Sequence, residues 1–122
     1  MLNTSFTQSF QITDHQTAIF LGSGSLPVYA TPSLVALMEN TSMKMLTDLP
    51  EGKTSVGIAI DVQHLKASPV GAVIECTATI TAIEGRKYTF NLKATDSNGV
   101  TIGEGTHQRV VVDIERFMSK CH

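Results

Sequence analysis

Three polar side chains are predicted to converge where a helix meets a sheet, and two of them are of types that suit general acid–base chemistry. Glu39 lies inside a predicted helix, close to its apolar sector, and His64 ends a predicted strand on the apolar face of that strand. A carboxylate and an imidazole at one helix–sheet interface are the usual groups for proton transfer. Thr31 begins the helix, where free N–H groups can hold a developing oxyanion or a phosphate. The sequence therefore indicates a candidate site of Thr31, Glu39 and His64.

Each of these residues also has a simpler structural interpretation. A carboxylate near a core costs several kcal/mol unless it is paired or hydrated, so Glu39 could lie at a solvated rim. A histidine on an apolar face is by itself more often a satisfied core residue than a functional one, so His64 could be buried and neutral. Their convergence on one interface is what favours a site.

The helix that would position Thr31 and Glu39 is predicted from residue 31 to about residue 48. Thr31 suits the N-cap and Pro32 the first helical position, where its missing N–H is not needed. Apolar residues then recur at helical spacing, namely Leu34, Leu37, Met38 and Met45. Pro50 disfavours helical geometry in the residue before it, so the helix should end near Leu49. Such a helix is roughly 25 Å long, enough to cross a small domain.

Most of the remaining chain alternates with a period of two, which predicts strands. Residues 5–13 suggest a first strand before the helix. Four more segments follow the helix: 54–64, 72–82, 87–94 and 100–115. Tight turns make the last three neighbouring and antiparallel, and Asn98-Gly99 is a strong hairpin signal.

Two of these strands carry details that matter for the site. The alternation in the strand 54–64 places one set of residues on the apolar face: Val56, Ile58, Ile60, Val62 and His64. The sequence does not decide which residues of the last strand face inward. Val110, Val112 and Ile114 suggest one inward face, but the same alternation continued toward the N-terminus would also turn Glu104 inward. Gly103 and Gly105 mark either a bulge or a close backbone approach.

One long helix and a mainly antiparallel sheet predict an α+β fold in which the sheet wraps around the helix. The length of 122 residues fits a single domain, residues 1–122. Open sheet edges and a mixed, threonine-rich outer face are surfaces that a homodimer would cover.

Composition excludes several classes of function. A net charge of −2 without a basic run gives no indication of a surface that binds nucleic acid or an acidic membrane. No signal-peptide pattern or membrane-length apolar stretch is present, so we expect a cytoplasmic protein. The four histidines lack metal-ligand spacing, and we expect no metal. Cys76 alternates with core residues and Cys121 is near the C-terminus; a buried thiol is favoured over a disulfide, which stays open as the alternative.

Four motifs make the chain resemble a known family over about residues 28 to 117. They are Val28-Tyr29-Ala30-Thr31-Pro32, Ala36-Leu37-Met38-Glu39, Ile60-Asp61-Val62-Gln63-His64 followed by Ala67-Ser68-Pro69-Val70-Gly71, and Gly105-Thr106-His107-Gln108-Arg109. Together they resemble the hotdog-fold thioesterases of the fluoroacetyl-CoA thioesterase type. The threonine and glutamate eight residues apart and the later Asp-Val-x-His are specific as a combination.

The resemblance implies roles for individual residues. In that family a threonine, a glutamate and a histidine form the catalytic set, which match Thr31, Glu39 and His64. Gly57 matches a glycine that lies against the substrate, and Arg109 matches an arginine expected to help bind coenzyme A. Members form dimers with sites at the subunit interface, so we expect a homodimer or a dimer of dimers. No cofactor is implied beyond coenzyme A as part of the substrate.

The segment before the helix departs from the family. The fluoroacetyl-CoA enzyme carries phenylalanines in a lid there, whereas this chain has Gly22-Ser23-Gly24-Ser25, which is either a connector or a cover for a pocket at the helix start. The resemblance therefore implies a thioesterase without implying the fluorinated substrate.

We accordingly expect hydrolysis of a small or medium acyl-CoA thioester. Glu39 would act as nucleophile or as general base for water. His64 would polarise the thioester carbonyl or move the proton, and Thr31 would orient Glu39 or the carbonyl. The alternatives are a non-catalytic acyl-CoA-binding module, a hydratase or dehydratase on the same fold, and a purely structural dimer.

Overall fold

The structure is a computed structural model that describes residues 4–121. Its elements in chain order are β1 (Ser5–Gln11), η1 (Asp14–Gln16), α1 (Ala18–Leu21), α2 (Thr31–Met43), η2 (Lys44–Leu46), β2 (Lys53–His64), β3 (Val73–Glu84), β4 (Lys87–Thr95), β5 (Thr101–Asp113) and α3 (Ile114–Ser119). The two η elements are single 3₁₀ turns. Among residues 4–121, no helix has the length and apolar character needed to cross a membrane.

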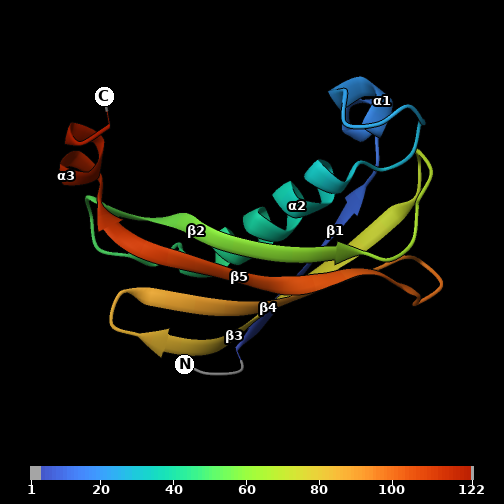
Figure 1. Cartoon of the computed structure of the whole chain (residues 1–122). Helices are drawn as coiled ribbons and strands as arrows, with labels where there is room; N and C mark the ends of the chain where they lie inside the picture. The colour runs from blue at the N-terminus through green and yellow to red at the C-terminus, as the bar shows by residue number, and fades with distance from the viewer. Residues whose placement is uncertain (1–3, 122) are drawn as a thin grey trace.

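The strands form one antiparallel sheet in the order β1-β3-β4-β5-β2. The sheet curves around α2, and α1 and α3 lie at its opposite ends (Figure 1). The predicted α+β architecture and the neighbouring, antiparallel arrangement of the last three strands are therefore confirmed. β2 forms one edge of the sheet, and its outer side has no strand partner among the described residues.

The central helix α2 begins one residue away from the predicted cap. Ala30 is the N-cap, with extended backbone and no side-chain cap hydrogen bond, and Thr31 is already helical. The prediction of Thr31 as N-cap is thus wrong, because its hydroxyl hydrogen-bonds to His64 instead. The α-helix ends at Met43 and continues as the 3₁₀ turn η2 to Leu46, short of the predicted end.

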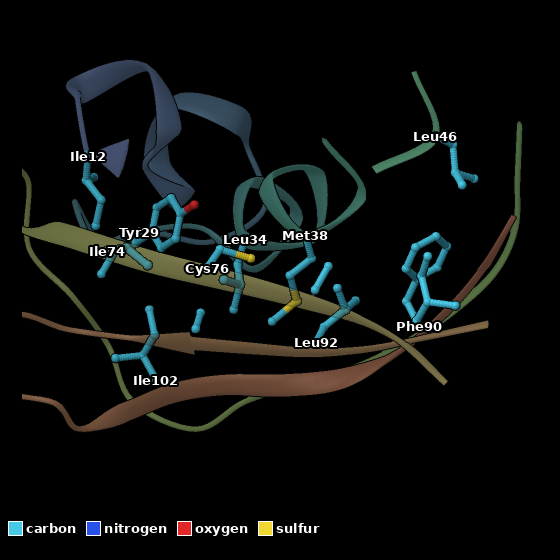
Figure 2. Close-up of a cluster of buried hydrophobic side chains, with 13 residues drawn as sticks. Ile12, Tyr29, Leu34, Met38, Leu46, Ile74, Cys76, Phe90, Leu92 and Ile102 are labelled. Carbon is cyan, nitrogen blue, oxygen red and sulfur yellow. The ribbon is translucent and has the colours of Figure 1, made fainter. Parts of the chain in front are cut away.

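The core lies between α2 and the concave face of the sheet. Leu34 and Met38 point from α2 toward the strands and are fully buried (Figure 2). A methyl group at Gly103 would lie 2.6 Å from Leu34 Cδ2, so the glycine allows α2 to approach β5 closely. Cys76 is a buried free thiol in this core, as predicted, and Cys121 is also free.

A β-bulge at Ile58 changes which residues of β2 face the helix. Gly57 pairs with Arg109 and Ala59 pairs with Gln108, so Ile58 is the extra residue. Gly57 shares the helix-facing side with Arg109, whereas beyond the bulge His64 shares that side with Gly103. The prediction of a single apolar face from Val56 to His64 is therefore wrong. The bulge shifts the alternation of side chains by one residue, so Gly57 and His64 lie on the same side of the strand although an odd number of positions separates them.

The same pairing fixes the phase of β5, which the sequence left open. His107 and Arg109 are buried on the helix-facing side, and Glu104 is exposed on the other. Gly105 provides the close backbone approach, since a methyl group there would collide with the backbone of Asp61.

Candidate active site

Thr31 and His64 meet at the N-terminal end of α2. Thr31 Oγ1 and His64 Nδ1 are 2.8 Å apart, a hydrogen bond that joins the first residue of the helix to the last residue of β2. The His64 and Tyr29 rings form a T-shaped pair, with the ring centroids 6.3 Å apart and the planes at 82°. Tyr29 is itself buried, so the imidazole is held on two sides.

The other nitrogen of His64 is unsatisfied. Nε2 is buried from solvent and has no hydrogen-bond partner among residues 4–121. Burial lowers the pKa of His64 below its ordinary value, which favours the neutral ring near pH 7. A buried polar atom without a partner is uncommon and calls for an explanation. In either tautomer, Nε2 is free to bind a substrate or a further side chain.

Thr31 and His64 border a small pocket of ≈ 290 Å³, here called the Thr31–His64 pocket. Its walls come from α1, the segment before α2 and the chain after β2: Ala18, Ser23, Val28, Tyr29, Ala30, Thr31, Pro32, His64, Leu65, Lys66 and Ala67. Ser23 belongs to the glycine- and serine-rich segment, so this segment contributes one residue to the wall of the pocket.

Glu39 lies elsewhere on α2, beside the middle of β2. A methyl group at Gly57 would be 3.4 Å from Glu39 Oε2, 3.4 Å from Arg109 Nη1 and 3.0 Å from His107 Cε1. These residues, together with Ser55, form what we call the Glu39 cluster. Gly57 is exposed, so the cluster opens to solvent beside the β2 edge.

Next to Glu39, a network of buried hydrogen bonds fixes the position of the Arg109 guanidinium. Arg109 donates from Nε to Ser55 Oγ (2.9 Å), from Nη2 to the Ser55 carbonyl (3.0 Å) and from Nη1 to His107 Nε2 (3.1 Å). His107 Nδ1 is 2.8 Å from the Ala59 carbonyl, which can only accept. His107 is therefore a neutral ring protonated on Nδ1. Burial lowers the pKa of Arg109, and the charge of Glu39 opposes that shift.

The structure thus separates the predicted site residues into two groups within one subunit. It brings Thr31 to His64, and it brings Gly57 and Arg109 to Glu39. Glu39 does not line the Thr31–His64 pocket, and eight residues of helix separate it from Thr31, a rise of about 12 Å. His107 is a residue of the Glu39 cluster for which the sequence predicted no role. Its position two residues before Arg109 places both side chains on the same face of one strand, and this spacing could have indicated it.

Residues 4–121 contain no group of three or more His, Cys, Asp or Glu side chains arranged to hold a metal ion.

The buried His107 gives a prediction about stability and pH. Burial is the main cause that lowers its pKa, and the charge of Arg109 acts in the same direction. As the pH falls through about 6.5, the unfolded chain binds a proton that native His107 resists, so the free energy of unfolding should fall by at most about 1.4 kcal/mol per pH unit from this residue. We expect His107→Asn to flatten this acid slope, measured by urea unfolding between pH 5 and 8.

His15 provides the matched control for that measurement because it is exposed. His15→Asn should leave the slope as in the wild type. An unchanged slope in His107→Asn would contradict the assignment of a neutral, protonation-resistant ring.

Comparisons with known proteins agree on one family. Residues 12–115 match the family model described as fluoroacetyl-CoA-specific thioesterase. A fluoroacetyl-CoA thioesterase from Streptantibioticus cattleyicolor is 37% identical over 123 residues, covering 94% of this chain and 87% of that protein. A crystal structure of a fluoroacetyl-CoA-specific thioesterase variant with fluoroacetate and CoA superposes with a TM-score of 0.90 at 33% identity, covering 96% of this chain and 98% of the other.

A more distant structure bears on the fold alone. A hot-dog-like protein from Thermanaerovibrio acidaminovorans has a TM-score of 0.90 at 24% identity and covers 98% of this chain and 89% of its own. The predicted hotdog fold is confirmed by these matches.

Proposed function

The chain belongs to the fluoroacetyl-CoA-specific thioesterase family, and on that premise we propose that it hydrolyses a small acyl-CoA thioester to the free acid and CoA. The single observation that carries this proposal is the buried, unpartnered Nε2 of His64 at the Thr31–His64 pocket. A buried nitrogen without a hydrogen-bond partner at the wall of a pocket is suited to form a hydrogen bond with a group of the bound substrate.

In this proposal Thr31 donates its hydroxyl hydrogen to His64 Nδ1, which leaves the imidazole proton on Nε2. Nε2–H then donates to the thioester carbonyl oxygen and stabilises the negative charge that develops there. A neutral ring suits this role because the lowered pKa of His64 keeps it from holding a second proton. Thr31 is accordingly an orienting residue for His64 rather than for Glu39.

Glu39 supplies the base. Its carboxylate takes a proton from water as the water oxygen bonds to the carbonyl carbon. The carbon–sulfur bond then breaks, and the proton passes from Glu39 to the CoA thiolate, which restores the carboxylate. Arg109 is 7% exposed and lies next to Glu39, so its positive charge acts on the Glu39 carboxylate. Gly57 has no side chain and leaves room for the substrate against β2.

Because Glu39 and His64 belong to different groups in one subunit, we propose that they meet across a homodimer. β2 is an edge strand with Ile58 54% exposed and Ile60 36% exposed, a surface that a second copy would cover. Antiparallel pairing of two β2 edges about a twofold axis close to Ile60 would place the His64 end of one strand beside the middle of its partner. The partner's Glu39 then faces the Thr31–His64 pocket.

The experiment that tests this function is a panel of acyl-CoA thioesters assayed for free CoA with a thiol reagent, without added cofactor. We expect release of CoA, with short acyl groups preferred because the pocket is only ≈ 290 Å³, and fluoroacetyl-CoA belongs in the panel because relatives are named for it. Binding of acyl-CoA without CoA release would identify a binding module. Water addition to an enoyl-CoA without CoA release would identify a hydratase.

A further inference from the structure

The hollow between β2, β5 and α3 concentrates positive charge in a chain whose net charge is −2. It has a volume of ≈ 380 Å³ and is lined by Lys53, Arg86, Val112, Asp113, Arg116, Phe117 and Lys120. Four of the nine lysines and arginines of the chain lie there. We propose that this basic hollow binds the phosphates and the adenosine of coenzyme A, an inference that rests on the proposed function.

The cations of the basic hollow are largely free to bind an anion. Among residues 4–121, none of them forms an ion pair: the two ion pairs there are Lys66–Asp96 and Lys87–Glu84. Arg86 uses Nη1 to donate to the Val111 carbonyl (3.1 Å), which fixes the side chain and leaves its other donors available. The one carboxylate in the lining, Asp113, accepts from the backbone N–H of Arg116 at 2.9 Å.

The chemistry of the lining matches a phosphorylated nucleotide. Arginine presents a planar set of donors that fits phosphate oxygens, and lysine adds point charges. Phe117 is 41% exposed, so its ring offers a face on which an adenine can stack. An acidic peptide without an aromatic side chain would use the charges but would leave this aromatic face without a stacking partner.

The distance from the basic hollow to Glu39 fits the length of coenzyme A. Lys53 precedes Gly57 by four residues on β2, and Lys53, Ser55 and Gly57 share one face of the strand. Four residues of strand span about 13 Å. The pantetheine arm between the thioester sulfur and the diphosphate has about as many chain atoms as four amino-acid residues, so it spans a similar distance when extended.

One subunit therefore carries both the carboxylate and the nucleotide site, joined by a single rigid strand. In the proposed dimer the acyl group points into the partner's Thr31–His64 pocket, while the phosphates stay on the subunit that supplies Glu39. Within one subunit, by contrast, the basic hollow and His64 lie at opposite ends of β2, next to α3 and α1 respectively (Figure 1).

The test uses the double variant Arg116→Gln with Lys120→Gln, two exposed residues outside the catalytic machinery. We expect the KM for acetyl-CoA to rise roughly tenfold, because two charge-assisted contacts to phosphate are lost, with kcat unchanged. Hydrolysis of acetyl-pantetheine, which lacks the nucleotide, should be the same in the variant and the wild type. The control is Lys87→Gln with Lys93→Gln, which removes equal charge from β4 and should leave both substrates unaffected.

Calorimetric titration with CoA, 3′-dephospho-CoA and inorganic phosphate separates this inference from the proposed function. Weaker CoA binding in the Arg116/Lys120 variant supports the site even if the wild type hydrolyses no thioester. Equal CoA affinity and equal KM in this variant and in the wild type would overturn the site while leaving hydrolysis intact. Equal weakening in the Lys87/Lys93 control would also overturn it, because the effect would then be one of net charge.

Discussion

Replacing Glu39 with glutamine is expected to lower kcat for acyl-CoA hydrolysis by about 10²- to 10⁴-fold, the usual contribution of a positioned general base. Glutamine keeps the size and shape of the side chain, but it is uncharged, replaces one acceptor oxygen with an NH2 donor and cannot take a proton from water. KM should change little, because Glu39 acts on the water rather than on the CoA portion. Steady-state assays of CoA release over a range of substrate concentrations measure both constants.

The matched control for this variant is Glu104→Gln. Glu104 is exposed on the outer face of β5, so its replacement removes the same charge without touching the site and should leave kcat unchanged. A Glu39→Gln protein with the activity of this control would rule out a catalytic carboxylate. Hydroxylamine trapping of an acyl group on Glu39 in the wild type would instead assign it as the nucleophile.

The second large effect is recovery of activity when two inactive variants share a dimer. Glu39→Gln and His64→Asn homodimers should each be nearly inactive. Random exchange makes half of the dimers mixed, and each mixed dimer has one site with both native residues if Glu39 and His64 come from different subunits. Denaturing and refolding the two proteins together should therefore restore about a quarter of wild-type kcat, measured per total subunit.

A different pair of variants provides the control for this experiment. Thr31 and His64 lie 2.8 Å apart in one subunit, so mixing Thr31→Ala with His64→Asn leaves every site with one substitution. That mixture should show no activity beyond the average of its parts. Recovery in the control but not in the Glu39 and His64 mixture would mean that the site is shared in another way.

The sequence by itself determined the elements and the architecture of this protein. Helical spacing from Leu34 to Met45 and period-two alternation in the strands are local patterns, and burying one apolar stripe against one apolar sheet face leaves few arrangements. The same patterns placed Cys76 in the core. Residue types, together with their places in these patterns, also selected Thr31, Glu39 and His64 as candidates for chemistry.

The tertiary structure decided which of these groups meet. The bulge at Ile58 changes which side chains of β2 point toward the helix in one half of the strand. The residues of β2 do not predict this bulge, because bulges arise from pairing with a second strand. The hydroxyl of Thr31 bonds to His64 rather than capping its own helix, a choice between a local and a distant partner. The placement of Glu39 over Arg109 and His107, apart from His64, likewise follows from contacts between residues far apart in the chain, which periodicity within one segment does not encode.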